Sequence, residues 1–263
     1  MDYNLRYVMY SMHNLYNYRK MYAMSIFILF LLNTESLSGG IHIIGDSHAA
    51  SCFSNSKIGI SAHEESIFVY SHNMGIRVPF VIDYRSASMH GIGINGLSSL
   101  NISKLGAQDG DICVFVYGEI DVRMHIGRLR DENQGDLNEM LDTLASDYMR
   151  TITENKELLN DLTFVIVSVL PPATNAACQP NPTYPVYGVV EDRVDITKKL
   201  NIRLKALAEK NGFLFLDIYP FYADANGVLI SALSDGHVHV NLNSNYRIKN
   251  ALVELLISKD IHW

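Results

Sequence analysis

Cysteine and tryptophan are scarce in this chain of 263 residues, which holds three cysteines and one tryptophan. Cys52, Cys113 and Cys178 lie far apart, and their spacing matches neither a metal site nor a disulfide framework. A free cysteine in an apolar stretch behaves as a small buried hydrophobe. We therefore expect the fold to depend on an ordinary apolar core, with no metal and no cofactor.

An excess of positive charge is also missing from the chain. The sequence has 21 Lys and Arg against 28 Asp and Glu, which gives a net charge of −7. The acidic residues are scattered, and no basic stripe is present to neutralise a phosphate backbone. The composition therefore argues against a nucleic-acid partner.

The N-terminal region, residues 1–40, lacks an apolar run of the ~20 residues that span a bilayer. Arg19 and Lys20 precede a shorter apolar run at residues 21–32. That length suits a signal peptide or a short anchor, which predicts secretion or membrane association through residues 21–32. The preceding segment is long, and no A-x-A-like cleavage site follows. A plain extension on a cytoplasmic protein is the alternative.

From Ile41 onward, short apolar runs alternate with amphipathic stretches. The runs are rich in β-branched and aromatic residues and are bounded by turn residues, which is typical of buried strands. They cover residues 41–44, 67–70, 112–117, 162–170 and 213–218. The pattern predicts one three-layer α/β/α domain over residues 41–263, with a parallel five-stranded sheet.

Three helices are predicted between and after these strands. Residues 137–152 carry apolar side chains at intervals of three and four after Gly135 and Asp136. A second helix is expected from about 191 to 210 and a third from about 244 to 258. In the second helix the expected apolar face consists of Ile196, Leu200, Ile202, Leu204 and Leu207.

Proline is concentrated in one segment, because five of the seven prolines lie between residues 171 and 188. Such a segment cannot form a regular helix or a central strand. It directly follows the run that ends at Leu170. We therefore expect an extended loop over the carboxyl edge of the sheet, where open α/β folds bind their ligands.

The first predicted strand leads into Gly45-Asp46-Ser47-His48, a tight turn followed by small residues that suit a helix start. Such a turn presents Ser47 at the end of the strand. A serine hydroxyl is a weak nucleophile and needs a neighbouring base, normally a histidine that a carboxylate orients. The alternative is an ordinary turn in which the polar residues cap a helix.

A second polar cluster, Ser234 to Asn241, precedes the last predicted helix and contains Asp235, His237 and His239. The pattern places it at the same edge of the sheet as Ser47. Serine, aspartate and histidine then occur together in one plausible site.

Gly45-Asp46-Ser47-His48 after an apolar strand resembles the first block of the SGNH (GDSL-like) hydrolases. Residues 167–172 resemble the strand and proline loop of that family, and residues 201–217 its helix and following strand. Residues 235–241 resemble its terminal Asp-x-x-His block. The blocks occur in the family's order, so the resemblance implies a flavodoxin-like α/β/α fold and carboxylic ester hydrolysis.

This resemblance implies Ser47 as nucleophile, a histidine as general base and Asp235 as the carboxylate that orients it. The family places the histidine three residues after the aspartate, where this chain has Val238. His239 is favoured because His-Val-Asn matches the family's His-Leu-Asn ending. His237 is the alternative base.

The resemblance also implies an oxyanion hole formed by the serine amide, a glycine amide and an asparagine side chain. The glycine block resembles Ser88 to Gly91, so Gly91 is the expected donor and Gly93 the alternative. Both could also be ordinary turn glycines.

The asparagine block is Gly118-Glu119-Ile120-Asp121, in which Ile120 replaces the asparagine. Glu119, Arg123 or a backbone amide is then expected to reshape the site. Structural anchoring of the loop is the other interpretation of Glu119 and Asp121.

The expected substrate is a small acyl ester, such as an O-acetyl group on a carbohydrate, and an O-acyltransferase would use the same machinery.

One alternative is a non-catalytic domain that binds a glycan or a protein. A metallophosphoesterase is the other, because Asp46-x-His48 and His237-x-His239 imitate metal motifs. A bridging asparagine and its histidine are missing between Asp121 and Asp235, which argues against a two-metal site. The sequence leaves the oligomeric state open.

Overall fold

The computed structural model describes residues 40–54, 63–71, 74–84, 88–178 and 182–261. Residues 21–32, the expected signal peptide or anchor, lie outside the described residues. Among the helices that are described, none is long and apolar enough to cross a membrane. The strands and helices that the structure describes belong to one compact unit, residues 39–263.

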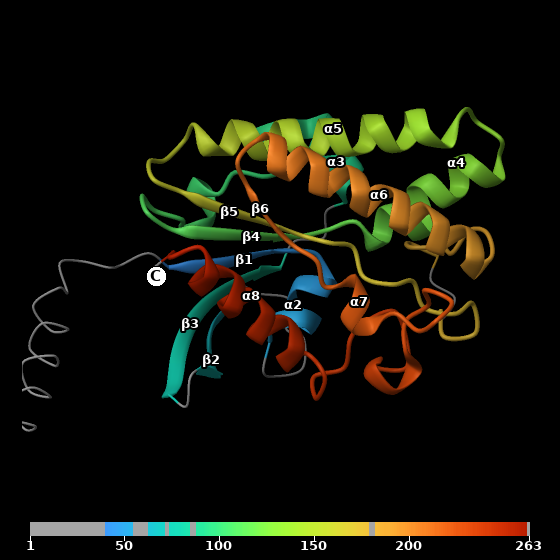
Figure 1. Ribbon diagram of the computed structural model, residues 1–263. Coiled ribbons are helices and arrows are strands. Elements are labelled where there is room, and N and C mark those ends of the chain that lie inside the picture. Colours follow the sequence, from blue (N-terminus) through green and yellow to red (C-terminus); the bar gives the residue numbers. More distant parts are fainter. Residues whose placement is uncertain (1–39, 55–62, 72–73, 85–87, 179–181, 262–263) are drawn as a thin grey trace, which may run out of the picture. The chain divides into compact units, whose positions relative to one another are not determined.

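Six strands form one sheet in the order β2-β3-β1-β4-β5-β6 (Figure 1). Their bounds are β1 Ile41–Gly45, β2 His63–Ser71, β3 Met74–Tyr84, β4 Ile112–Val116, β5 Thr163–Val167 and β6 Leu214–Leu216. Every neighbouring pair is parallel except β2 with β3. The sheet therefore has five parallel strands, which is the predicted number, together with one antiparallel edge strand. Counted along the chain, the parallel strands have the flavodoxin-like order 2-1-3-4-5.

One strand prediction was wrong. Residues 67–70 were expected in a parallel strand, but they lie in β2, which pairs antiparallel with β3. The parallel partner of β1 is β3, which the sequence did not reveal because Pro79 interrupts its apolar pattern. Strand β1 pairs only with Phe80–Tyr84, so the missing N–H of Pro79 falls outside that parallel ladder.

Helices cover both faces of the sheet (Figure 1). One face carries α2 (Ser47–Phe53), α7 (Tyr219–Tyr222) and α8 (Tyr246–Ser258). The other carries α3 (Met89–Asn95), α5 (Leu137–Lys156) and α6 (Val190–Lys210). A π-helical segment, η3 (Asp121–Ile126), and the short helix α4 (Gly127–Asp131) follow β4. Single-turn 3₁₀ segments are η1 Gly96–Ser98, η2 Ser103–Leu105 and η4 Ser231–Leu233.

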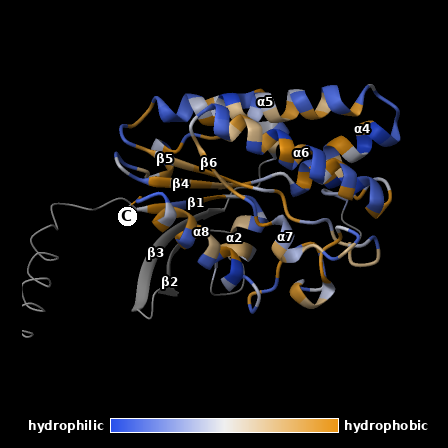
Figure 2. Ribbon diagram, in the orientation of Figure 1, coloured by the Kyte–Doolittle hydropathy of each residue, from blue (hydrophilic) through white to orange (hydrophobic). Residues whose placement is uncertain are grey.

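The core is divided by the sheet into two apolar clusters. Along β4, Ile112, Val114 and Val116 belong to the cluster beneath α2 and α8, whereas Cys113 and Phe115 belong to the cluster beneath α5 and α6. Successive side chains of a strand point to opposite faces, so a strand buried on both sides is apolar throughout. Figure 2 shows this contrast between apolar strands and helices with polar outer surfaces.

The three predicted helices are present, with the second at α6. Asp136 caps α5 by accepting hydrogen bonds from the amides of Asn138 and Glu139, which explains the helix start after Gly135. The expected apolar face of α6 holds except at Ile202, whose side chain is 68% exposed. Ile202 lies two residues from both Leu200 and Leu204, a spacing that turns it away from their face.

The proline-rich segment is a loop, since no helix or strand occurs in its described residues 171–178 and 182–188. It is held to the residues after β4 by two hydrogen bonds. Arg123 Nη1 donates to the carbonyl of Tyr184 at 2.6 Å, and the amide of Tyr187 donates to the carbonyl of Arg123 at 3.0 Å. The loop therefore lies at the carboxyl edge of the sheet, as its position after β5 predicts.

Gly45 marks the point where β1, β4 and α2 approach most closely. A Cβ atom there would lie 2.6 Å from Cβ of Ala49 and against the carbonyl oxygen of Val116. Such overlap costs about 1–3 kcal/mol. We expect Gly45→Ala to lower the free energy of unfolding by about that amount in urea titrations. Gly91→Ala is the matched control, because its Cβ would meet only Ser88 Oγ, at 3.5 Å. Equal stability of the two variants would contradict the prediction.

Candidate active site

Ser47 is the first residue of α2, directly after the turn at the end of β1. Asp46 caps the helix by accepting a hydrogen bond from the amide of His48 at 2.8 Å. Gly45 leaves no room for a side chain, so the chain turns sharply between strand and helix. The reversal of strand order lies between β1 and β4, and their carboxyl ends form the crevice where folds of this topology bind ligands.

The loop from Ser234 to Val240 presents the candidate base. An antiparallel bridge joins Ser234 to Val240, and the amide of Asp235 donates to the carbonyl of His239 at 3.0 Å. The carboxylate of Asp235 accepts the amides of His237 at 2.8 Å and His239 at 3.3 Å. These bonds within the loop hold the Asp235 carboxylate beside the His239 ring.

The structure brings together Ser47, His239 and Asp235. Nε2 of His239 lies 2.8 Å from Oγ of Ser47, and Nδ1 of the same ring lies 3.2 Å from Oδ2 of Asp235. The backbone of His237 is bonded within the loop, to Asp235 and Ser234. The ring at hydrogen-bond distance from the serine hydroxyl is that of His239. A hydroxyl, an imidazole and a carboxylate in this sequence can transfer a proton from serine.

The environment of His239 favours its neutral form. Burial lowers its pKa, the positive charge of His48 lowers it further, and Asp235 acts in the opposite direction. The result is a pKa below the ordinary value for histidine. A neutral imidazole at neutral pH can accept a proton, as a general base must.

Glu119 follows the end of β4 and forms a buried ion pair. Its carboxylate accepts two hydrogen bonds from the guanidinium of Arg123, at 2.7 and 3.0 Å. Burial would raise the pKa of Glu119, but the charges of His48 and Arg123 outweigh it and lower the pKa below its usual value. Because Arg123 also holds the proline loop, Glu119 anchors that loop at the carboxyl edge.

Ile120 and Asp121 follow Glu119 and are both buried. Ile120 has no side-chain donor, as its type requires. Asp121 accepts hydrogen bonds from the amides of Met89 at 2.8 Å and His90 at 3.0 Å. Burial raises the pKa of Asp121 to about 7, although these two hydrogen bonds act against the rise. Asp121 therefore fixes the start of α3 against the loop after β4.

The glycines expected as oxyanion donors are used for other purposes. The amide of Gly91 donates to Oγ of Ser88 at 3.1 Å, which is the N-terminal cap of α3. A Cβ at Gly93 would lie 2.8 Å from Cβ of Asp147, so this glycine permits close packing of α3 on α5. The expectation that the Gly91 amide is free for an oxyanion therefore needs correction, because capping of α3 uses it.

The sequence singled out His48 only as part of the Asp46-x-His48 metal motif, and not as a residue of the serine site. His48 is buried beside Asp46, and its ring centroid lies 4.7 Å from that of His239. The spacing Asp46-x-His48 was the available signal of this contact, because residues two apart at a helix cap can place a carboxylate within hydrogen-bond distance of an imidazole. The same spacing also imitates a metal motif, so the sequence did not distinguish a metal site from a hydrogen bond between Asp46 and His48. In the part of the chain that the structure describes, no three metal-ligating side chains gather.

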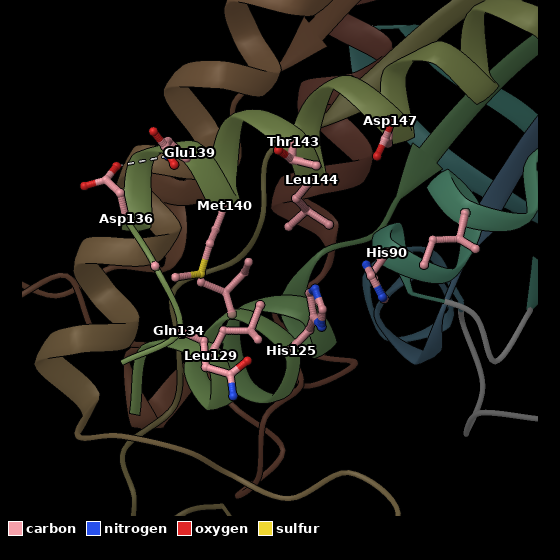
Figure 3. Close-up of a pocket in the computed structure, with 13 residues that line it drawn as sticks. His90, His125, Leu129, Gln134, Asp136, Glu139, Met140, Thr143, Leu144 and Asp147 are labelled. Atoms are coloured by element: carbon pink, nitrogen blue, oxygen red, sulfur yellow. Dashed lines mark hydrogen bonds between the residues drawn. The ribbon is translucent and has the colours of Figure 1, made fainter. Parts of the chain in front are cut away.

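A cavity of about 470 Å³ lies between α3, α4 and α5 (Figure 3). The rings of His90 and His125 stack on one another at its wall, with centroids 3.7 Å apart. Burial lowers the pKa of both histidines, to about 4 for His125. Neither Ser47 nor His239 lines this cavity. It is therefore a separate feature from the serine and histidine pair.

The Glu119–Arg123 pair allows a matched test of stability. Removal of one partner of a buried ion pair leaves the other charge unpaired, which costs about 3–5 kcal/mol. We expect Glu119→Ala to lower the free energy of unfolding by about 3 kcal/mol, measured by urea denaturation at pH 7. Glu132→Ala breaks the exposed Arg128–Glu132 pair, which has the same spacing of four residues, and should cost under about 1 kcal/mol. Similar losses in both variants would show that Glu119 is not an anchor.

No family model matches the chain, and no curated protein sequence matches it. Solved structures do match. One is a proposed acylhydrolase from Bacteroides fragilis, at 17% identity and a TM-score of 0.51, covering 88% of this chain and 95% of that chain. Another is a catalytic mutant of an acetylxylan esterase from Geobacillus stearothermophilus, at 11% identity and a TM-score of 0.50, covering 83% of this chain and 94% of that chain. The chain therefore has the α/β/α fold of these proteins, and the resemblance to the SGNH hydrolases is confirmed at the level of the fold.

Proposed function

We propose that this protein is a serine esterase that hydrolyses small acyl esters, with Ser47 as nucleophile, His239 as general base and Asp235 as the carboxylate that orients the base. The observation that carries the proposal is the 2.8 Å separation of Ser47 Oγ and His239 Nε2. These atoms belong to residues 192 positions apart in the chain. Two such groups at hydrogen-bond distance at the switch point of an α/β sheet are the arrangement that nucleophilic catalysis needs.

The reaction proceeds in two halves. His239 Nε2 takes the proton of Ser47 as Oγ bonds to the acyl carbon, and the carbonyl oxygen becomes an oxyanion. Collapse of that intermediate breaks the ester bond, and the leaving alcohol takes the proton from His239. A water molecule then gives a proton to His239 and attacks the acyl carbon, which forms a second tetrahedral intermediate. Its collapse breaks the bond to Oγ and releases the acid, and Oγ takes the proton back from His239. The carboxylate of Asp235 lies beside Nδ1 and stabilises the imidazolium that forms in each half.

The oxyanion would be held by few donors. The amide of Ser47 lies at the start of α2, where the first amides of a helix have no partner within it. Gly91 donates to Ser88, and Ile120 has no side-chain donor. Loss of one oxyanion donor typically lowers the rate by ~10² to 10³. The proposed esterase is therefore a slow one on simple esters.

Acetylated carbohydrate is the substrate class that we favour. Support comes from the fold shared with an acetylxylan esterase of Geobacillus stearothermophilus. Transfer of the acyl group to a sugar hydroxyl would use the same residues, with the sugar hydroxyl in place of water. Assays of acetylated sugars with and without added acceptor separate hydrolysis from transfer.

The second candidate function is a non-catalytic domain that binds a glycan or a protein. The use of the Gly91 amide as a helix cap favours it, because a site short of oxyanion donors is a poor catalyst. Covalent labelling by an organophosphonate distinguishes the two functions. An activated serine reacts with this probe, whereas a serine in a binding domain does not.

Ser47→Ala should abolish the hydrolysis of p-nitrophenyl acetate, because no acyl-enzyme can form. The melting temperature should change little, since the hydroxyl is removed from a half-buried position. Initial rates and thermal unfolding measure the two effects. Retained turnover would reject Ser47 as the nucleophile, and native protein that neither reacts with phosphonate nor hydrolyses any ester would favour the binding domain.

The two histidines of the 234–240 loop should behave differently. His239→Gln removes the base, so kcat/KM should fall by about 10³-fold or more. His237→Gln is the matched control in the same loop. General-base catalysis contributes about 10² or more to the rate, and His239 still supplies it in this variant. The variant should therefore retain kcat/KM within about threefold. A larger loss for His237→Gln than for His239→Gln would transfer the base to His237.

A further inference from the structure

His48 has a hydrogen-bond acceptor at each of its two ring nitrogens. Nδ1 lies 3.1 Å from Oδ1 of Asp46, and Nε2 lies 3.3 Å from the carbonyl oxygen of Val238. A backbone carbonyl can only accept. Oδ1 of Asp46 already accepts the backbone amide of His48, so this oxygen also acts as an acceptor. Both ring nitrogens then carry hydrogen, which makes the side chain an imidazolium ion.

Negative groups surround this imidazolium in the interior. His48 is 3% exposed, and burial by itself would lower its pKa. The Asp46 carboxylate, the hydrogen bond to it, the charge of Glu119 and the Val238 carbonyl together raise the pKa above the ordinary value. The charge follows from the hydrogen-bond geometry, and the surrounding carboxylates make that charge tolerable in the interior.

The imidazolium also connects two parts of the candidate site. Asp46 belongs to the turn after β1, and Val238 is the residue directly before His239. The bond from His48 to the Val238 carbonyl joins these two segments across 190 positions of the chain. The rings of His48 and His239 lie 4.7 Å apart and are tilted by 45°. A bond to the residue before His239 restricts where the His239 ring can lie.

We propose that His48 is a positioning residue for the proposed esterase, an imidazolium that ties the Val238 carbonyl to Asp46 and so holds His239 against Ser47. The inference rests on the proposed function, in which His239 is the base. The ring of His48 bonds to Asp46 and to the Val238 carbonyl, and in this proposal it acts on the reaction only through His239. Its fixed positive charge disfavours a second positive charge on the neighbouring ring.

The charged groups that face the two rings come from three segments. The turn after β1 contributes Asp46, the segment after β4 contributes Glu119 with its partner Arg123, and the 234–240 loop contributes Asp235. Burial and the charge of His48 lower the pKa of His239, whereas Asp235 and Glu119 raise it. Loss of the His48 charge leaves Asp46, Glu119 and Asp235 in place. The pKa of His239 then rises.

His48→Gln tests the proposal, because glutamine keeps a polar side chain and cannot carry the charge. We expect the pKa of His239, followed by NMR titration of its ring, to rise by roughly one unit. We also expect kcat/KM to fall about tenfold, with the acid limb of its pH profile displaced upward by the same unit. A purely structural role for His48 would lower the amount of folded protein without moving the pH profile. An unchanged His239 titration in folded His48→Gln protein would overturn the proposal.

His42→Gln is the matched control. His42 is also buried on β1 and pairs with a carboxylate, Asp111, at 2.9 Å. It lies at the amino end of the strand, away from the turn that carries Ser47. We expect His42→Gln to leave the His239 titration unchanged, whatever its effect on stability. An equal rise of the His239 pKa in both variants would show that the rise comes from a general loss of stability. That result would overturn the proposal.

A measurement on the native protein needs no variant. In protein labelled with ¹⁵N-histidine, both ring nitrogens of His48 should show the chemical shifts of protonated nitrogen at pH 7. Shifts typical of a neutral tautomer would overturn the proposal. These outcomes are separate from failure of the esterase proposal, because active Ser47→Ala protein would reject Ser47 as nucleophile without altering the His48 resonances.

Discussion

The close approach of β1, β4 and the start of α2 at Gly45 is the constraint on which the site depends. Because no side chain fits there, the chain can turn at once from strand to helix. Three consecutive polar residues, Asp46 to His48, then lie between the carboxyl ends of β1 and β4. A wider turn would place the serine hydroxyl beyond reach of a histidine that comes from the far end of the chain.

Buried charge is unusually concentrated around this turn. Asp46, His48, Glu119 and Arg123 are all buried, and the ion pairs Asp46–His48 and Glu119–Arg123 lie beside one another. Isolated buried charges are costly, and paired ones are retained where they fix a geometry. The Glu119–Arg123 pair flanks Ile120, which stands where the resemblance to the SGNH hydrolases implies an asparagine. This charged pair holds the proline-rich loop in place through the bond from Arg123 to the Tyr184 carbonyl.

Much of the architecture follows from the sequence, because apolar runs and helical periodicity report burial directly. The helices after Asp136 and Val189 and the strands β1, β4, β5 and β6 could be predicted in this way. Strand β3 could not, since Pro79 breaks the apolar pattern and the pairing that tolerates it depends on a neighbouring strand.

In the candidate site, motif order predicted the meeting of Ser47 with His239. It could not predict that Ser88 caps α3 with the Gly91 amide, or that His48 bonds to Val238. These contacts depend on how the chain folds, and the spacing of the residues along the sequence does not report them.

The proline-rich loop is anchored to the rest of the fold by two arginines. Arg123 joins this loop to Glu119, and Arg193 donates to the carbonyl of Ala173 and the side chain of Asn175 in the same loop. If the loop were lifted, Arg193 would lose its acceptors at Ala173 and Asn175, and Arg123 would lose the Tyr184 carbonyl and keep only Glu119. Opening of the loop therefore belongs to the same cooperative unit as unfolding of the sheet edge. The described residues of the loop would then present a fixed wall to a substrate of the proposed esterase, and not a gate that closes over it.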